Sequence, residues 1–84
     1  MSRPVLAIDP GREKCGVAVL AADGSILMQE VVLTTTLDSV VGALAAAHEP
    51  TIIMGSGTTS AEARARVEAL GRTVTLVDEY RTTD

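Results

Sequence analysis

Val5–Gly16, VLAIDPGREKCG, is the stretch that decides the fold. Four apolar residues lead to an acid, a Pro-Gly turn follows, and a second apolar run, GVAVLA, begins at Gly16. An uninterrupted apolar run is typical of a central strand that is covered on both faces. The acid at its end, Asp9, is of a type that is rarely buried unless it is paired or liganded. The stretch therefore predicts a central strand that brings a carboxylate to a turn, where it can form part of a site.

The residues that follow predict a meander and then a crossover. Asp23-Gly24 is a strong hairpin signal, so we expect a strand over about residues 15–21 to pair antiparallel with one over about 25–33. Thr35 to Asp38 has the form of a capping box, and apolar residues at helical spacing then predict a helix that ends near His48. A short strand over 51–54 should return parallel to the first strand.

The last third of the chain predicts a second helix and a final strand. Thr59 and Glu62 have the spacing of a helix cap, and the helix should present Ala63, Val67 and Leu70 inward before it ends at Gly71. A strand over 73–77 then leads to Asp78 and Glu79. We therefore expect one α/β domain over residues 1–84, with a five-stranded mixed sheet and the element order β-β-β-α-β-α-β.

Composition limits the class of protein. The 84 residues are 46% hydrophobic with one aromatic residue, so the core must consist of aliphatic side chains. No window approaches the roughly 20 apolar residues of a membrane span, and a single cysteine excludes an internal disulfide. These features predict a cytoplasmic protein. The net charge of −4 is opposite to that of a typical nucleic-acid binder, so any polyanion would need a local basic patch or bound cations.

Acids at strand ends suggest a metal site. If the first, fourth and fifth strands are parallel, Asp9, Asp78 and Glu79 emerge at one edge of the sheet. Bound divalent cations would offset the repulsion between these carboxylates, and Mg²⁺ prefers such oxygen ligands. Neighbours on a strand point to opposite faces, so one of Asp78 and Glu79 should enter the site, and we favour Glu79. In the alternative interpretation, Asp9 caps its turn and the two later acids are solvated.

Two motifs carry a resemblance to a known family. IDPGREKCGVAV resembles the opening motif of the YqgF family (RuvX, Holliday-junction-resolvase-like) of the ribonuclease H superfold, and VDEYRTT resembles its second signature. The resemblance implies a ribonuclease H-like sheet and a metal-dependent nuclease, a hydrolase that cleaves branched DNA or structured RNA in the manner of a resolvase or a pre-rRNA-processing enzyme. It implies Asp9 and Glu79 as catalytic metal ligands, with Asp78 beside them, and Mg²⁺ or Mn²⁺ as cofactor.

Other residues are candidates for substrate binding. Gly55, Gly57 and Thr58 lie between a strand and a helix, where backbone N–H groups can meet a phosphate. Arg12 and Lys14 follow Gly11 in the turn after Asp9 and could attract a phosphate backbone, and Arg81 follows the second signature. The alternative for Arg12 and Lys14 is a solvated hairpin. A dinucleotide site is disfavoured because the third glycine of its motif is absent.

The resemblance also has departures. Family nucleases continue into a helix that supplies a last acid, whereas this chain stops at Asp84, and Tyr80 stands where the family usually has Arg. The middle motif, IIMGSGTT, looks more like the related domain of the transcription accessory protein Tex. A non-catalytic nucleic-acid-binding or dimerisation module is therefore the alternative function. Without the last helix one face of the sheet would be apolar and open, so we expect a homodimer.

Overall fold

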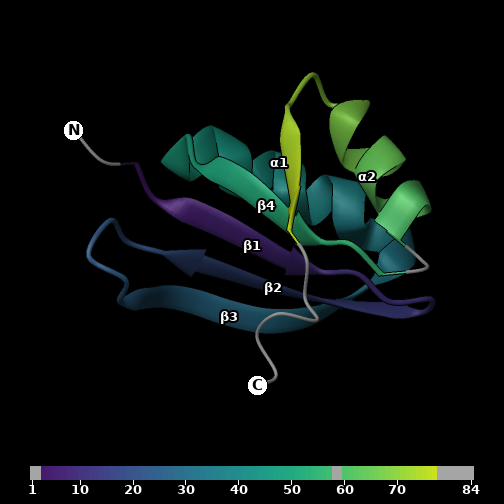
Figure 1. Cartoon of the computed structure of the whole chain (residues 1–84), viewed down its shortest axis with the longest axis horizontal. Helices are drawn as coiled ribbons and strands as arrows, with labels where there is room; N and C mark the ends of the chain where they lie inside the picture. Colours follow the sequence, from purple (N-terminus) through teal and green to yellow (C-terminus); the bar gives the residue numbers. More distant parts are fainter. Residues whose placement is uncertain (1–2, 58–59, 78–84) are drawn as a thin grey trace.

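Five strands form one mixed sheet in the computed structural model, which describes residues 3–57 and 60–77 (Figure 1). The elements in chain order are β1 (Val5–Asp9), β2 (Lys14–Leu20), β3 (Ile26–Leu33), the 3₁₀ turn η1 (Thr34–Thr36), α1 (Leu37–His48), β4 (Thr51–Gly55), α2 (Ser60–Glu68) and β5 (Val74–Val77). The predicted element types and their order are confirmed.

The strands lie in the order β3-β2-β1-β4-β5. The pairs β1–β2 and β2–β3 are antiparallel, and β4 lies parallel to both β1 and β5. The predicted meander and the parallel return after α1 are thus confirmed. Because β1, β4 and β5 run in the same direction, their carboxyl ends meet at one edge of the sheet.

The core lies on the face of the sheet that carries α1 and α2, the upper, far side in Figure 1. Leu6, Ile8, Val17 and Val19 point to this face and are almost completely buried, and Leu37 of α1 is buried with them. Within residues 3–57 and 60–77, no helix covers the other face. In this described part, the first strand is therefore covered by helices on one face and not, as expected, on both.

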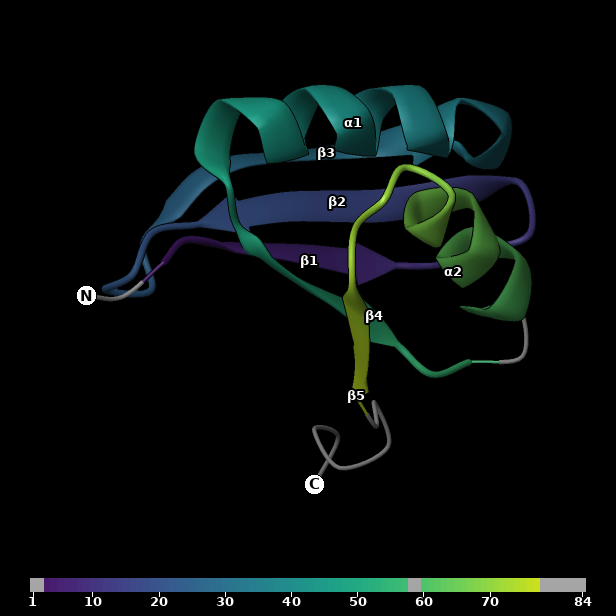
Figure 2. The ribbon, with the colours of Figure 1, turned by 90° about the horizontal axis from the view of Figure 1, so that it is seen from above.

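The reason lies in the size of the side chains on the second face. On β1 and β2, Ala7, Gly16 and Ala18 occupy this open face, and all three are half-buried although no helix lies over them. Residues this small are partly shielded by their own neighbours, so they lengthen the apolar run in the sequence without needing a covering layer. Figures 1 and 2 also show a strong twist, with β5 lying across the direction of β1, which makes the open face concave.

The Asp23-Gly24 hairpin forms as predicted. Gly24 has a φ of 93°, a conformation that glycine adopts readily, and its N–H donates to the carbonyl oxygen of Ala21 at 2.8 Å. The Asp23 carboxylate accepts hydrogen bonds from the Ser25 N–H at 2.9 Å and the Ser25 hydroxyl at 2.7 Å. These bonds lower the pKa of Asp23, with the backbone donor as the largest cause.

The start of α1 differs from the expectation. No side-chain bond caps the helix; its N-cap residue is Thr36, whose hydroxyl donates backward to the Leu33 carbonyl oxygen at 2.9 Å. The predicted capping box from Thr35 to Asp38 is therefore wrong, because the η1 turn takes up the threonines first. The end of α1 at His48 agrees with the prediction, and Glu49 closes it in the left-handed conformation with a φ of 51°.

The second helix buries Ala63 and Val67 as predicted, whereas Leu70 lies beyond its end and is 40% exposed. On its exposed side, Arg64 pairs with Glu68 at 3.1 Å. The half-buried Arg66 pairs with Glu62 at 3.3 Å and also lies 3.9 Å from Asp38 of α1. The predicted cap residue Thr59 lies outside the described residues. Among those that are described, no helix has the length and apolar character needed to cross a membrane.

Candidate phosphate-binding edge of the sheet

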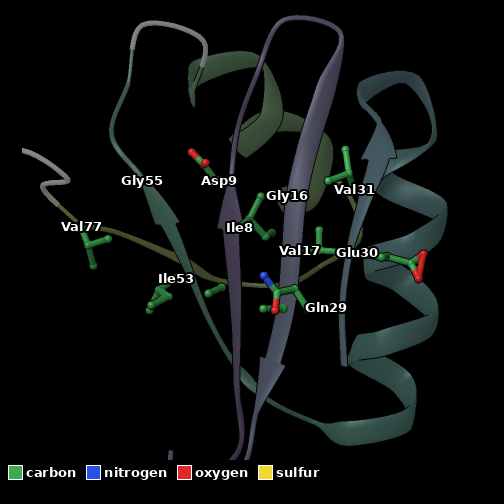
Figure 3. A pocket seen from close by; sticks show the side chains of 12 residues that line it. Ile8, Asp9, Gly16, Val17, Gln29, Glu30, Val31, Ile53, Gly55 and Val77 are labelled. Atoms are coloured by element: carbon green, nitrogen blue, oxygen red, sulfur yellow. The ribbon is translucent and has the colours of Figure 1, made fainter. Parts of the chain in front are cut away.

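Asp9 is the last residue of β1 and lies opposite Gly16 of β2. Its side chain is exposed and belongs to the open face, at the end of the sheet next to the β1–β2 turn (Figure 3). The parallel register of β1 with β4 pairs Ile8 with Met54, so Asp9 lies at the level of Gly55, which in turn pairs with Val77 of β5. The strand ends that the sequence predicted to converge therefore do so.

A groove runs along the open face from Asp9. It has a volume of about 540 Å³ and is lined by all five strands. The small residues Ala7, Gly16 and Ala18 form its floor, and the larger Val31 and Ile53 flank them. Gln29 also reaches into it, whereas the side chain of Glu30 points away (Figure 3). Asp9 is thus the acid that faces the groove among the residues whose placement the structure gives.

The turn after Asp9 has a tightly fixed backbone. A Cβ atom on Gly11 would lie 2.2 Å from the Lys14 carbonyl oxygen, a distance that real Cβ atoms do not reach, so the turn requires glycine. The turn presents Arg12, and Lys14 follows as the first residue of β2; both are exposed and lie close to the end of β1. Lys14 lies two residues before Gly16 on β2 and therefore on the same face as Asp9.

Thr34, the residue directly after β3, holds this turn, although the sequence analysis did not single it out. Its buried hydroxyl donates to the Gly11 carbonyl oxygen at 2.9 Å, and its backbone N–H donates to the Glu13 carbonyl oxygen at 2.8 Å. The Cys15 sulfur lies 3.3 Å from the same hydroxyl. In the sequence, Thr34 belongs to a run of three threonines that was interpreted only as the start of a helix, so nothing marked its side chain as a partner of the turn. Cys15 itself is a buried free thiol.

Gly55 and Gly57, at the end of β4 and in the turn after it, differ in their roles. Gly55 is not part of the turn but is the last, buried residue of β4 and borders the groove. The Gly57 carbonyl oxygen accepts hydrogen bonds from the Ser60 N–H at 3.1 Å and the Ser60 hydroxyl at 2.7 Å, so Gly57 serves to start α2. Its expected role in substrate binding stays a prediction.

Four predicted site residues, Thr58, Asp78, Glu79 and Arg81, lie outside the described residues. Within the described part, no group of three His, Cys, Asp or Glu side chains is arranged to hold a metal ion. The pairing of Asp9 with Glu79 therefore stays a prediction. Asp9 alone supplies a single carboxylate, which suits a Mg²⁺ ion that is otherwise held by water and by phosphate oxygens of a ligand.

No protein family and no curated protein matches the sequence significantly. Solved structures share its fold. The Ppx/GppA phosphatase of Aquifex aeolicus superposes with a TM-score of 0.55 at 12% identity, over 92% of this chain and 36% of that chain. A second Aquifex aeolicus structure, of the PPX-GPPA enzyme, gives 0.57 at 15% identity, over 94% and 37%. YeaZ from Pseudomonas aeruginosa gives 0.52 at 26% identity, over 93% and 44%.

These neighbours correct the family assignment. They are Ppx/GppA and YeaZ proteins, so the resemblance to the YqgF family and the resolvase-type nuclease function inferred from it are wrong, and the non-catalytic alternative gains no support. The physical reason is that the opening motif describes a strand, an acid and a glycine turn, which is a local geometry and does not specify a reaction. The chain spans less than half the length of these neighbours.

Proposed function

We propose that the chain forms one lobe of a phosphate-handling protein and that the edge of the sheet around Asp9 binds a phosphate group together with Mg²⁺. The observation that carries this proposal is the position of Asp9, an exposed carboxylate at the carboxyl end of a central strand, beside a glycine turn that bears Arg12 and Lys14. In open α/β sheets, ligands bind outside the carboxyl ends of the strands. The likeness to a phosphatase of Aquifex aeolicus supports the choice of ligand.

The charges around the edge suggest how a phosphate and a metal ion would bind together. A carboxylate repels a phosphate unless a cation lies between them, and Mg²⁺ is usually bound by one or two carboxylates plus phosphate oxygens. Asp9 would be the protein ligand of the ion, and Glu79 or Asp78 would be a second one if the predicted pairing holds. Arg12 and Lys14 would add positive charge at the outer side of the phosphate. The bound ion would neutralise phosphate charge.

Titration with inorganic tripolyphosphate tests the proposal. Amide resonances of residues 11–16 should shift in the presence of Mg²⁺ and tripolyphosphate together, and much less with Mg²⁺ alone, since Asp9 is expected to hold the ion only weakly by itself. Asp9→Asn should weaken the binding by about tenfold or more, the equivalent of roughly 1.4 kcal/mol. Glu30→Gln is the matched control, because the Glu30 side chain points away from the groove.

Three results would reject the proposal. One is the absence of resonance shifts in the wild-type protein at millimolar tripolyphosphate with Mg²⁺. A second is equal affinity of the Asp9→Asn variant and the wild type. A loss of binding in Glu30→Gln as large as that in Asp9→Asn would also place the site elsewhere.

Finer assignments of fold and location are proposals too. A ribonuclease H-like sheet, in the broad sense of strand arrangement, is supported by the order β3-β2-β1-β4-β5 with three leading antiparallel strands. A single domain over residues 1–84 is supported by the one sheet that all five strands share. A cytoplasmic location and binding to branched DNA or structured RNA stay untested predictions.

A further inference from the structure

The outer strand β3 carries an unusual number of exposed aliphatic side chains. Ile26, Leu27, Val31 and Leu33 are 60%, 53%, 68% and 54% exposed. They are four of the seven large hydrophobic residues that are exposed in the described part of the chain. The strand has eight residues, and among the strands that the structure describes it pairs with β2 alone, so within the described residues one side of its backbone has no neighbouring strand. An exposed, long, apolar edge strand is a template for pairing with another strand.

The features that normally protect such an edge are few here. β3 contains no lysine and no proline, and its single charge is Glu30. A register shift between Val19 and Leu20 leaves Leu27 out of the ladder at the start of the strand. From Met28 to Leu33 the pairing with β2 is regular, so this segment offers an edge without a bulge.

We propose that a second copy of the chain pairs with this edge, β3 against β3, antiparallel across a two-fold axis that passes beside Val31. In an antiparallel pair, directly opposed residues point to the same face of the sheet, whereas consecutive residues of one strand point to opposite faces. The two-fold axis must therefore pass between a residue and its own copy, because an axis between two consecutive residues would pair side chains on opposite faces. An axis beside Glu30 would place two like charges opposite each other, which is destabilising. With an axis beside Met28 or Gln29, the paired segment would include Leu27, which the register shift leaves out of the ladder with β2.

The register beside Val31 uses only the regular segment of β3. Val31 then faces Val31 of the partner subunit, Gln29 faces Leu33 of the partner subunit, and Glu30 faces Val32 of the partner subunit. No directly opposed pair carries like charges, and the most exposed aliphatic side chain lies at the centre of the contact. Because Val31 also borders the groove, the two open faces would join into one surface. This contact uses the β3 edge and is independent of phosphate binding at Asp9.

Cysteine cross-linking tests both the partner and the register. Directly opposed residues of an antiparallel pair have Cα atoms about 4.5–5.5 Å apart, within the range of a disulfide. Val31→Cys should therefore form a covalent dimer on mild oxidation, about tenfold more than Gln29→Cys or Glu30→Cys, whose copies are offset along the strand. The native thiol, Cys15, is only 1% exposed and should not contribute.

Light scattering supplies the second measurement. The wild type should have twice the mass of one chain at about 100 µM, a concentration at which a micromolar dimer is nearly saturated. Val31→Lys should reduce the mass to that of one chain, while Thr75→Lys, an exposed position on the opposite edge strand, should leave the dimer intact. A monomeric or an open-ended wild-type assembly, a dimeric Val31→Lys variant, or stronger cross-linking of Glu30→Cys than of Val31→Cys would overturn the proposal.

Discussion

Replacing Thr34 by valine removes the hydroxyl that holds the β1–β2 turn and leaves a side chain of nearly the same shape. In the folded protein this hydroxyl is buried, donates to the Gly11 carbonyl oxygen at 2.9 Å and lies 3.3 Å from the Cys15 sulfur. Valine leaves the partly buried carbonyl oxygen of Gly11 with the long, weak contact from the Cys15 thiol at 3.9 Å in place of this donor. Leaving a buried polar group without its partner costs about 1–3 kcal/mol. We therefore expect Thr34→Val to lower the free energy of unfolding by that amount.

Urea unfolding followed by circular dichroism measures the change, and thermal unfolding should show a decrease of roughly 4–8 °C per kcal/mol for a domain of this size. Thr34→Ser keeps the hydroxyl and should lose less stability than Thr34→Val. Thr75→Val removes an exposed hydroxyl on β5 and should stay within about 0.5 kcal/mol of the wild type. If Thr34→Val were as stable as the wild type, the contact between Thr34 and the turn would have no energetic role.

Two further predictions concern turns. Gly11→Ala should destabilise the fold by about 1–3 kcal/mol in urea unfolding, because the new Cβ would meet the Lys14 carbonyl oxygen at 2.2 Å. Gly57→Ala is the control and should be nearly neutral, because no heavy atom lies within 4 Å of its Cβ. Equal effects of the two substitutions would contradict the close approach at Gly11. The lowered pKa of Asp23 means that its stabilising contribution is complete above the ordinary carboxyl pKa of about 3.9 and is lost as the pH falls through the lower folded value. An NMR titration should show this lowered pKa, and Ser25→Ala should raise it toward the ordinary value; an unchanged pKa in that variant would show that Ser25 is not its cause.

The sequence predicted the elements whose signals are local. The Asp23-Gly24 hairpin and the end of α1 at His48 came from turn chemistry and from residues that stop helices, and both lie where expected. The meander and the parallel return followed from the order of these elements. The position of Asp9 at the edge of the sheet could also be predicted, because a strand of known direction determines where its last residue lies.

What the sequence could not predict depends on contacts between distant residues. The bond from Thr34 to Gly11 joins positions 23 residues apart, and nothing in a run of three threonines distinguishes the one that turns inward. The open face of β1 was missed because Ala7 is hydrophobic and yet needs no covering layer. The family was wrongly assigned because a short motif at one strand end describes local geometry, whereas the arrangement of the whole sheet is shared with a Ppx/GppA phosphatase and with YeaZ.

The separation of the two faces of the sheet has a consequence for how this protein can change over time. Along β1 and β2, successive residues alternate between a tightly packed interior and the floor of the groove. Positions such as Leu6 and Val17 are limited by the volume available under the helices, while Ala7 and Ala18 meet only the groove and whatever enters it. Every second residue of these strands can therefore be substituted in ways that alter what the groove binds, while the residues between them maintain the packed interior. A saturation mutagenesis library of β1 and β2 should show that tolerance to substitution alternates from one residue to the next.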